Sequence, residues 1–265
     1  MPRRPLVMGV LNVTPDSFSD GGLFLDVDAA VAHGVEMMDE GADVIDVGGA
    51  STRPGSVQPS QDEEAARVVP VVARLAELGR ARVSIDTMTP GVARAAVAAG
   101  ATLINDVSAA LWPIAAETGV GWAAMHMQGD PATMQADPHY DDVVGEVLAF
   151  LVERGERARS AGVAEVWIDP GFGFGKSVAH NVTLLARLDE FCATAYPVLV
   201  GLSRKSVLGA LAPNPDGSIP PPADRLEASL AGVVWAATKG VGMVRVHDVA
   251  ATVAAVRIVC DEVGV

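Results

Sequence analysis

Short apolar runs alternate with longer helical segments along the whole chain, and the alternation recurs about eight times. The runs are nearly continuous in apolar residues, as expected of strands that are buried on both faces of a parallel sheet. A strand followed by a helix, repeated this often in 265 residues, predicts a closed α/β fold, the (β/α)8 TIM barrel. The predicted strands are residues 6–12, 43–48, 82–86, 102–107, 122–126, 166–169, 197–203 and 243–247.

The segments between these runs carry helix start and stop signals. Ser60 and Glu63 have the spacing of a capping box, and Gly79 is placed to end the helix that they begin. Thr89 followed by Pro90 predicts an N-cap and a first-turn proline for the next helix. These signals mark the helices that a (β/α)8 barrel requires between its strands.

An open, doubly wound sheet is the competing fold. Its glycine-rich fingerprint should follow the first strand, and the stretch NVTPDSFSDGG at that place does not match the fingerprint. No stretch has the composition of an interdomain linker, so we expect residues 1–265 to form a single domain. The proline-rich residues 212–225 are predicted to be an exposed loop inside this domain.

Composition narrows the function classes. The formal net charge is -14 and the pI is about 4.6, which argues against a nucleic-acid partner because such binding needs clustered positive charge. No apolar run is long enough for a membrane span, and the N-terminal apolar stretch is too short for a signal peptide. The two cysteines lie outside any metal-binding or disulfide pattern, so a reduced, cytoplasmic protein is expected.

Polar residues collect where the predicted strands end. In a barrel of this kind the carboxyl ends of the strands meet on one rim, where catalytic residues are found. Aspartate and asparagine side chains suit the amino and amide edge of a flat nitrogen heterocycle, whereas lysine, arginine and histidine suit a phosphate or a ring carbonyl. The rim residues are Asn12, Asp46, Asp86, Asn105, Asp106, His126, Asp169, Ser203, Arg204, Lys205, Arg245 and His247.

No nucleophile–base pair stands out among these residues. The rim therefore predicts a site that binds ligands and stabilises charge, more than a site for covalent catalysis. Arg245 and His247 are two residues apart on one strand, so they should point to the same side.

The stretch IDPGFGFGKS (168–177) resembles a phosphate-binding loop but fails the required spacing. A P-loop needs a glycine five residues before Gly175, and that position holds Pro170. The carboxylate of Asp169 would also repel a triphosphate. The alternating glycines are better explained by a tight turn beneath a ligand whose edge Asp169 binds, with Phe172 and Phe174 as candidate aromatic surfaces.

Eight stretches in the same order resemble the dihydropteroate synthase family over essentially the whole chain. Each stretch alone is weakly specific, but together they are highly specific. They are GVLNVTPDSFSDGG (9–22), ADVIDVGGASTRPGS (42–56), SIDTM (84–88), INDVS (104–108), MHMQG (125–129), IDPGFGFGK (168–176), GLSRKS (201–206) and RVHDV (245–249).

The resemblance implies a TIM barrel that joins 6-hydroxymethyl-7,8-dihydropterin pyrophosphate to p-aminobenzoate, in folate biosynthesis. It implies a pterin site of Asp86, Asn105, Met125, Asp169, Phe174 and Lys205. It further implies that Asn12 binds Mg²⁺ and that Arg245 and His247 hold the pyrophosphate. The p-aminobenzoate region would comprise Phe18, Thr52, Arg53, Pro54 and Ser206, and the protein would be a homodimer.

The sequence departs from the family pattern at three places. A glutamate is usual where Ala50 stands, a glycine pair where Ala109 and Ala110 stand, here followed by Leu111 and Trp112, and an aromatic residue where Val207 stands. We expect these departures to lie on the p-aminobenzoate side, where they would alter the response to sulfonamides. They leave open whether the protein is a sulfonamide target or a sulfonamide-insensitive variant.

Two alternatives share the expected pterin pocket. A pterin-dependent methyltransferase would not be expected to keep both STRPG (51–55) and SRKS (203–206). A non-catalytic pterin-binding paralogue should lack the residues that handle the anion, and the sequence retains them. Both alternatives are therefore less favoured than the synthase.

Overall fold

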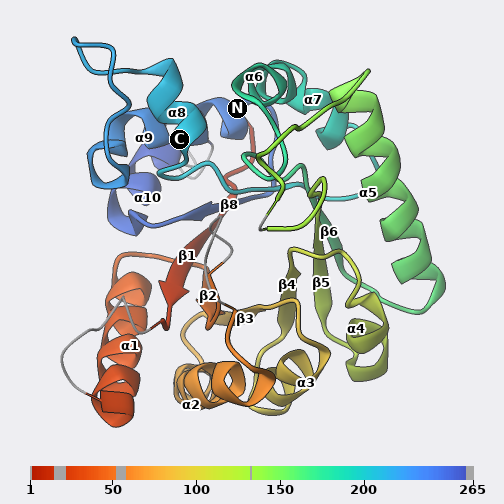
Figure 1. The fold of residues 1–265 in the computed structure, drawn as a ribbon. Helices are drawn as coiled ribbons and strands as arrows, with labels where there is room; N and C mark the ends of the chain where they lie inside the picture. The colour runs from red at the N-terminus through yellow and green to blue at the C-terminus, as the bar shows by residue number, and fades with distance from the viewer. Residues whose placement is uncertain (1, 15–21, 52–57, 132, 261–265) are drawn as a thin grey trace.

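The computed structural model describes residues 2–14, 22–51, 58–131 and 133–260. Eight parallel strands form one sheet in the order β6-β5-β4-β3-β2-β1-β8-β7 (Figure 1). Ile168 in β6 pairs with Val198, just before β7, and this bridge joins the two ends of the order. The strands are β1 (Leu6–Asn12), β2 (Val44–Gly48), β3 (Arg82–Asp86), β4 (Leu103–Asp106), β5 (Gly121–Met125), β6 (Val166–Asp169), β7 (Leu199–Val200) and β8 (Met243–Val246).

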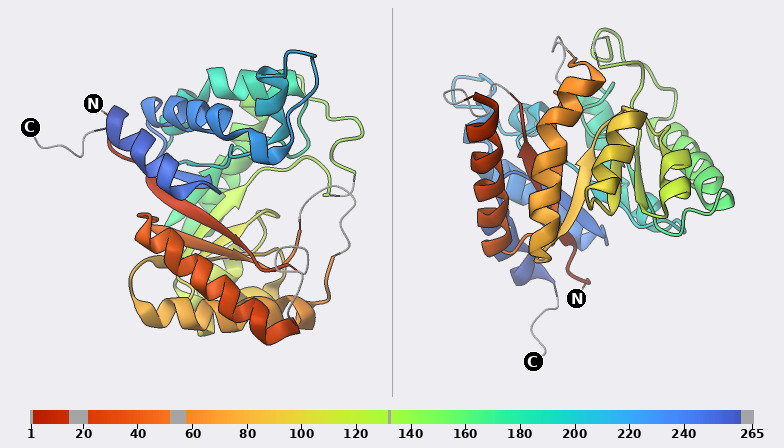
Figure 2. Two further views of the ribbon diagram at one scale, coloured as in Figure 1. Left: turned by 90° about the vertical axis from the view of Figure 1, so that its left-hand side faces the viewer. Right: turned by 90° about the horizontal axis from the view of Figure 1, so that it is seen from below.

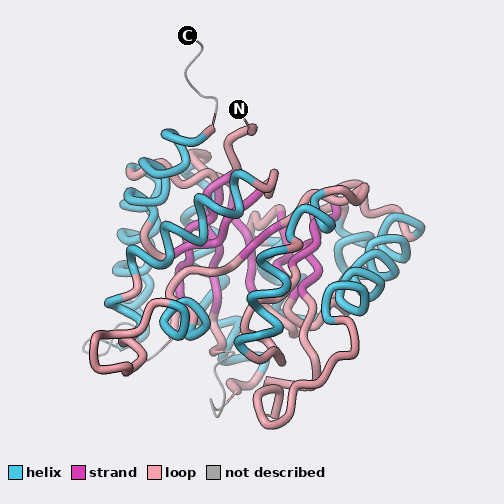
Figure 3. Tube along the Cα trace, turned by 90° about the horizontal axis from the view of Figure 1, so that it is seen from above, coloured by secondary structure: helices cyan, strands magenta, loops and turns pink. Residues whose placement is uncertain are grey.

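Helices surround the strands, so the predicted (β/α)8 TIM barrel is confirmed (Figure 3). Figure 2 shows α1 and α2 side by side, with α3, α4 and α5 following around the barrel. The helices are α1 (Gly22–Asp39), α2 (Gln61–Leu78), α3 (Pro90–Ala98), α4 (Trp112–Thr118), α5 (Val143–Ser160), α6 (Val178–Ala186), α7 (Leu188–Cys192), α8 (Ser206–Leu211), α9 (Leu226–Thr238) and α10 (Val249–Val259), with a 3₁₀ turn at Pro222–Asp224.

The seventh strand differs most from its prediction. The sequence predicts a strand over 197–203, but only Leu199 and Val200 form β7. Pro197 has no N–H to donate and accepts a bond from Ile168 through its carbonyl. The chain after Val200 bends toward the polar rim, where the side chains of Ser203 and Arg204 bond to the loop after β8.

The predicted helix starts are confirmed in part. Ser60 and Glu63 form the capping box, and Gly79 ends α2 in the left-handed conformation, with φ 60°. Thr89 stands at the N-cap of α3 but makes no side-chain cap bond. Its hydroxyl donates instead to the buried carboxylate of Glu64, at 3.0 Å. That tertiary bond ties α2 to the loop after β3.

The barrel has an apolar layer inside the ring of strands, separate from the larger core between strands and helices. The side chains of this inner layer come from seven strands and pack against one another. Successive residues of a strand point to opposite faces, so the residue two positions further on also points inward. The inner layer is Met8, Val44, Leu103, Ala123, Trp167, Leu199 and Met243.

The proline-rich segment is largely an exposed loop, as predicted. Residues 212–219 are exposed, whereas Pro220 and Arg225 are buried.

In the part of the chain that the structure describes, no helix combines the length and apolar character needed to cross a bilayer.

Candidate active site

A polar layer lies directly above the apolar layer inside the barrel. On five strands, the residue two positions beyond the inner apolar side chain also points into the barrel. These residues are Asp46, Asn105, Met125, Asp169 and Arg245. The strand register then sets Asn12, Gly48, Asp86 and Asn105 side by side on β1 to β4. The predicted rim residues therefore converge because the strands alternate and pair in register.

Arg245 joins two of these strands to its own. Its Nε donates to Asp46 at 2.6 Å, and its Nη2 donates to Asp86 at 2.7 Å. Asn105 also donates to Asp46, at 2.9 Å. Burial alone would lower the pKa of Arg245, but the carboxylates of Asp46 and Asp86 outweigh burial and raise the pKa above its ordinary value. Arg245 is thus a fixed cation that also orients Asp86, a broader role than the expected one toward a phosphate.

Asp86 is a carboxylate of this network whose pKa lies near neutral pH. Burial raises the pKa of Asp86 to about 7, and the carboxylates of Asp46, Glu64 and Asp106 add to the rise, while Arg245 opposes it. A carboxyl group with this pKa changes charge close to neutral pH. Its ability to accept hydrogen bonds from a ligand therefore depends on pH.

Asp169 ends β6 and faces a lysine across the top of the barrel. Its Oδ1 accepts the backbone N–H of Gly171 at 2.8 Å. Burial raises the pKa of Asp169, and Lys205 is the strongest influence opposing that rise. Burial likewise lowers the pKa of Lys205 to about 8, with Asp169 opposing. The two groups hold each other in the charged state.

Lys205 also contacts the glycine turn that follows β6. Its Nζ donates to the carbonyl of Phe172 and lies 4.5 Å from the centre of the Phe174 ring. Phe172 itself is fully buried in the core, whereas Phe174 is partly exposed. Of the two candidate aromatic surfaces, only Phe174 can therefore offer its ring to a ligand.

The P-loop-like lysine, Lys176, points into its own turn. Its ammonium donates to the carbonyls of Phe174, Gly171 and His126 at 2.9, 3.0 and 3.2 Å. Burial lowers the pKa of Lys176 to about 7, and it lowers the pKa of His126, whose Nδ1 lies 3.0 Å from Lys176 Nζ, to about 3. The lysine supports the turn that carries Asp169 and is committed to backbone carbonyls, not to a phosphate.

Asn12 lies at the end of β1, with a gap beside it on β2. The neighbouring residue Gly48 has no side chain, and a Cβ built there would lie 3.8 Å from Asn12 Oδ1 and 3.6 Å from Asp86 Oδ2. An amide oxygen and a carboxylate oxygen thus border one small space. Oxygen donors of this kind are the ligands that Mg²⁺ prefers, together with phosphate oxygens and water.

The loops after β7 and β8 are linked by two pairs of side chains. Ser203 Oγ lies 3.1 Å from Nδ1 of His247 and accepts the backbone N–H of the same residue at 3.2 Å. Arg204, which has a positive φ of 59°, donates to both carboxylate oxygens of Asp248, at 3.1 and 2.6 Å. These links hold His247 beside the start of α8.

The structure brings most of the predicted site residues together on one rim and leaves some untested. Ser206 is exposed at the first position of α8, next to Lys205. Phe18, Thr52, Arg53 and Pro54 lie outside the described residues.

Several departures from the family pattern face the core and not the rim. Val207, Ala109 and Leu111 are at most 3% exposed and pack in the large core cluster. Ala109 has a φ of 51°, a conformation that glycine adopts without strain. Ala50, two residues after β2, is half-buried, as is Trp112, and Ala110 is exposed.

Sequence reasoning missed the roles of Asp46 and Lys176. Asp46 was visible as a rim residue, but its place between Arg245 and Asn105 depends on the pairing of distant strands. Lys176 was seen only as a failed P-loop lysine. The signal that could have suggested its role is the position of Lys176 directly after a glycine-rich turn, whose backbone carbonyls a lysine can bind.

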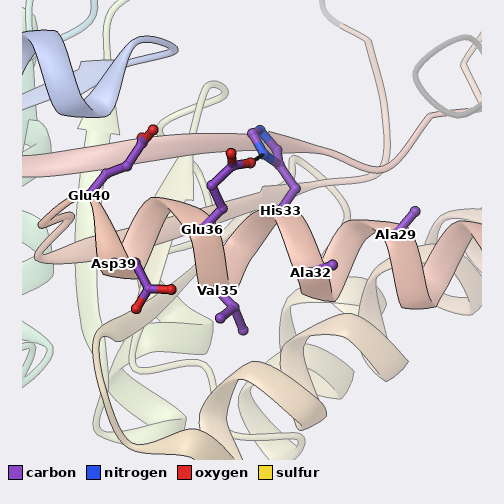
Figure 4. A pocket seen from close by; sticks show the side chains of 7 residues that line it. All are labelled: Ala29, Ala32, His33, Val35, Glu36, Asp39 and Glu40. Carbon is purple, nitrogen blue, oxygen red and sulfur yellow. Dashed lines mark hydrogen bonds and ion pairs between the residues drawn. The ribbon is translucent and has the colours of Figure 1, made fainter.

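A shallow hollow on α1 lies apart from this rim (Figure 4). In Figure 4, His33 and Glu36 point toward each other, with Nδ1 and Oε2 3.0 Å apart. A ligand there would contact one helix only, so we assign the hollow no function. Its lining residues are Ala29, Ala32, His33, Val35, Glu36, Asp39 and Glu40.

Comparison with known proteins agrees with this geometry. The family model described as "Pterin binding enzyme" matches residues 8–247. The dihydropteroate synthase of Escherichia coli (strain K12) is 48% identical over 262 residues, which cover 97% of this chain and 91% of that protein.

Two solved structures from Xanthomonas albilineans are similar over almost the whole chain. Dihydropteroate synthase with 4-aminobenzoic acid is 49% identical, with a TM-score of 0.88, and the match covers 96% of this chain and 92% of that one. Dihydropteroate synthase in complex with 7,8-dihydropteroate is 48% identical, with a TM-score of 0.84 and the same coverage of 96% and 92%. With its rim of Asp86, Asn105, Asp169 and Lys205 on a matching barrel, the chain belongs to the dihydropteroate synthase family of pterin binding enzymes.

Proposed function

We propose that this protein condenses 6-hydroxymethyl-7,8-dihydropterin pyrophosphate with p-aminobenzoate, giving 7,8-dihydropteroate and pyrophosphate. The observation that carries the proposal is the polar layer at the rim of the barrel, in which Arg245 binds Asp46 and Asp86 while Lys205 acts electrostatically on Asp169. The relatives whose structures hold 4-aminobenzoic acid and 7,8-dihydropteroate support the same substrate classes.

The pterin ring would bind at the carboxylate side of the rim. The ring presents amino and amide donors, which Asp169 and Asp86 can accept and Asn105 can complement. Lys205 can donate to the ring carbonyl, while Phe174 and Met125 provide apolar surface. The ion pair of Asp86 with Arg245 and the hydrogen bond of Asp169 with the Gly171 N–H keep these carboxylates oriented before the ligand arrives, which reduces the cost of binding.

The pyrophosphate would lie on the opposite side, near β1 and β8. Arg245 still has its Nη1 for an anion, His247 adds a nitrogen donor, and Asn12 would hold Mg²⁺ through its amide oxygen. When bound, Mg²⁺ would neutralise negative charge on the leaving group. The residues of the chain stabilise the departing pyrophosphate through fixed positive charge and hydrogen bonds.

The reaction needs no protein nucleophile. The C–O bond to pyrophosphate breaks, the neutral arylamine nitrogen forms the new C–N bond, and the nitrogen loses one proton. A resonance-stabilised pterin cation makes this attack easy, which fits a rim built for charge stabilisation. Ser206 beside Lys205, together with Phe18, Thr52, Arg53 and Pro54, is proposed to hold p-aminobenzoate.

A turnover assay with both substrates and Mg²⁺ tests the function, and Asp169→Ala tests the site. The variant should lose a charge-assisted hydrogen-bond pair of about 1.5–3 kcal/mol, so calorimetry should show pterin affinity about 10- to 150-fold weaker. Binding within about threefold of wild type would remove Asp169 from the pterin site. A wild-type protein that binds pterin without turnover would instead favour the non-catalytic paralogue.

The charge of Asp86 predicts a pH dependence of pterin binding. The ionised carboxylate is needed to accept ring donors, so affinity for a phosphate-free pterin should rise as pH increases through about 7. The stability of the empty fold should change in the opposite direction. The pKa of Asp86 is about 7 in the folded protein against its ordinary value of 3.8, so the free energy of unfolding should fall as pH rises between these two values. Calorimetric titrations between about pH 5.5 and 8.5 would measure the step, which should vanish in Asp86→Asn. A step of equal size in both proteins would assign it to another group.

We further propose a homodimer and a single domain. The dimer would use α9 and α6, where Trp235, Val178 and Val182 are 45%, 46% and 40% exposed although they are large and apolar. Sedimentation of wild type beside Trp235→Glu would test it, since a charge in the interface should favour monomers. Strands from both halves of the chain share one sheet, which supports one domain. A cytoplasmic location and the response to sulfonamides stay predictions.

A further inference from the structure

The Ser203 hydroxyl makes two contacts with a single residue. Ser203 follows β7 and is 7% exposed. Its Oγ accepts the backbone N–H of His247 at 3.2 Å and lies 3.1 Å from Nδ1 of the same residue. The Oγ atom of Ser203 therefore contacts both the backbone and the imidazole ring of His247.

The number of protons available to this pair limits how the ring can be protonated. A serine hydroxyl has one proton and two lone pairs, and one lone pair already receives the His247 backbone N–H. Among the described residues, the hydroxyl proton has no acceptor other than His247 Nδ1. A buried hydroxyl that leaves its proton unused loses a hydrogen bond, so the proton should point to Nδ1. Nδ1 is then an acceptor, and the proton of the neutral ring lies on Nε2.

We propose that Ser203 is a positioning residue that fixes the tautomer of His247, so that the neutral ring presents Nε2–H to the pyrophosphate. The proposal rests on the anion-binding role of His247 in the proposed function. Phosphate oxygens act as acceptors, so an Nε2 without its proton would present a lone pair to a lone pair. His247 is only partly buried and follows β8, the strand that carries Arg245.

A purely mechanical role for Ser203 predicts a different pattern of effects. Arg204 and Asp248 join the same two loops through a two-point ion pair, without touching either nitrogen of the His247 ring. If Ser203 served only to hold the loops together, weakening this neighbouring pair should have the same consequences. Asp248→Asn is therefore the matched control for Ser203→Ala.

Nitrogen-15 NMR of the imidazole rings measures the tautomer directly. The chain has five histidines, so the His247 signals are assigned by their loss in His247→Ala. A pH titration of the His247 signals first identifies the range in which the ring is neutral, and the tautomer is measured there. Wild type and Asp248→Asn should show an unprotonated Nδ1 and a protonated Nε2. In Ser203→Ala the two signals should move toward each other, and Ser203→Thr, which keeps the hydroxyl, should restore the separation.

Binding and turnover test the consequence of the tautomer. In Ser203→Ala the affinity for inorganic pyrophosphate with Mg²⁺ should fall about three- to tenfold, the range of one net hydrogen bond. The KM for pterin pyrophosphate should rise by a similar factor, while the KM for p-aminobenzoate stays unchanged. Asp248→Asn should keep its pyrophosphate affinity.

Three results would overturn the proposal. A wild-type ring protonated at Nδ1 would contradict the tautomer. Wild-type pyrophosphate affinity in Ser203→Ala would show that the tautomer does not matter, and equal losses in Asp248→Asn would assign the effect to the loops. If His247→Ala binds pyrophosphate normally, the anion role in the proposed function fails instead, and the NMR measurement still decides whether Ser203 sets the tautomer.

Discussion

Replacing Arg245 with alanine is expected to lower the free energy of unfolding by about 3–5 kcal/mol, the loss typical when a buried charge loses its partner. Asp46 is fully buried and lies 2.6 Å from the guanidinium, so no solvent can take over the interaction. Asp86 would lose its partner at 2.7 Å at the same time. Urea unfolding of the variant beside wild type measures the difference.

The companion variants separate charge from packing. Asp46→Asn in the Arg245→Ala background removes one unpaired charge and should recover part of the lost stability. Pterin affinity should fall in Arg245→Ala even for a pterin without phosphates, because Asp86 would no longer be oriented. A stability loss below about 1 kcal/mol would mean that the pair acts like an exposed salt bridge.

Gly171→Ala should lower turnover by about 100-fold, the loss that a displacement of 1 Å can cause. A Cβ at this position would lie 1.9 Å from the backbone oxygen of His126, so the turn must move, and Asp169 moves with it. The φ of 67° adds strain of about 1–2 kcal/mol for any residue with a Cβ.

Gly173→Ala provides the matched control for the clash. Gly173 also has a positive φ, 80°, but the nearest atom to its Cβ would be the side chain of Lys205 at 3.5 Å. Gly173→Ala should therefore have the backbone strain of Gly171→Ala without its displacement of the turn, and its turnover should stay within about tenfold of wild type. Equal losses of turnover in the two variants would mean that backbone strain, and not the contact with His126, governs this turn.

The fold was largely predictable because the barrel repeats one local pattern. The strands Arg82–Asp86 and Val166–Asp169 begin and end where their apolar runs do. The extent of the seventh strand was not predictable from its apolar residues alone. Pro197 lacks an N–H for sheet pairing, and the residues after Val200 turn toward the rim. The cap at Thr89 failed for a similar reason, since a distant glutamate takes its hydroxyl.

The candidate site was predictable as a set of rim residues but not as a network. Which strand ends carry carboxylates can be read from the sequence, whereas the sharing of Arg245 between Asp46 and Asp86 follows from closure of the barrel. Burial of Phe172, with Phe174 left partly exposed, depends on the direction of the turn. Val207 and Ala109 were assigned to the substrate rim by their position in motifs, and packing places them in the core.

The short seventh strand leaves a seam in the wall of the barrel. Between β6 and β7 the described pairing is the bridge of Ile168 to Val198, whereas β1 with β2 and β2 with β3 share five pairs each. Lys205, which follows β7, donates across this seam to the carbonyl of Phe172, and Asp169 ends β6 on the other side. A pterin that binds both Asp169 and Lys205 would link the ends of β6 and β7. Backbone amides along the seam should then exchange hydrogen with solvent fastest in the empty protein and slow most when pterin binds.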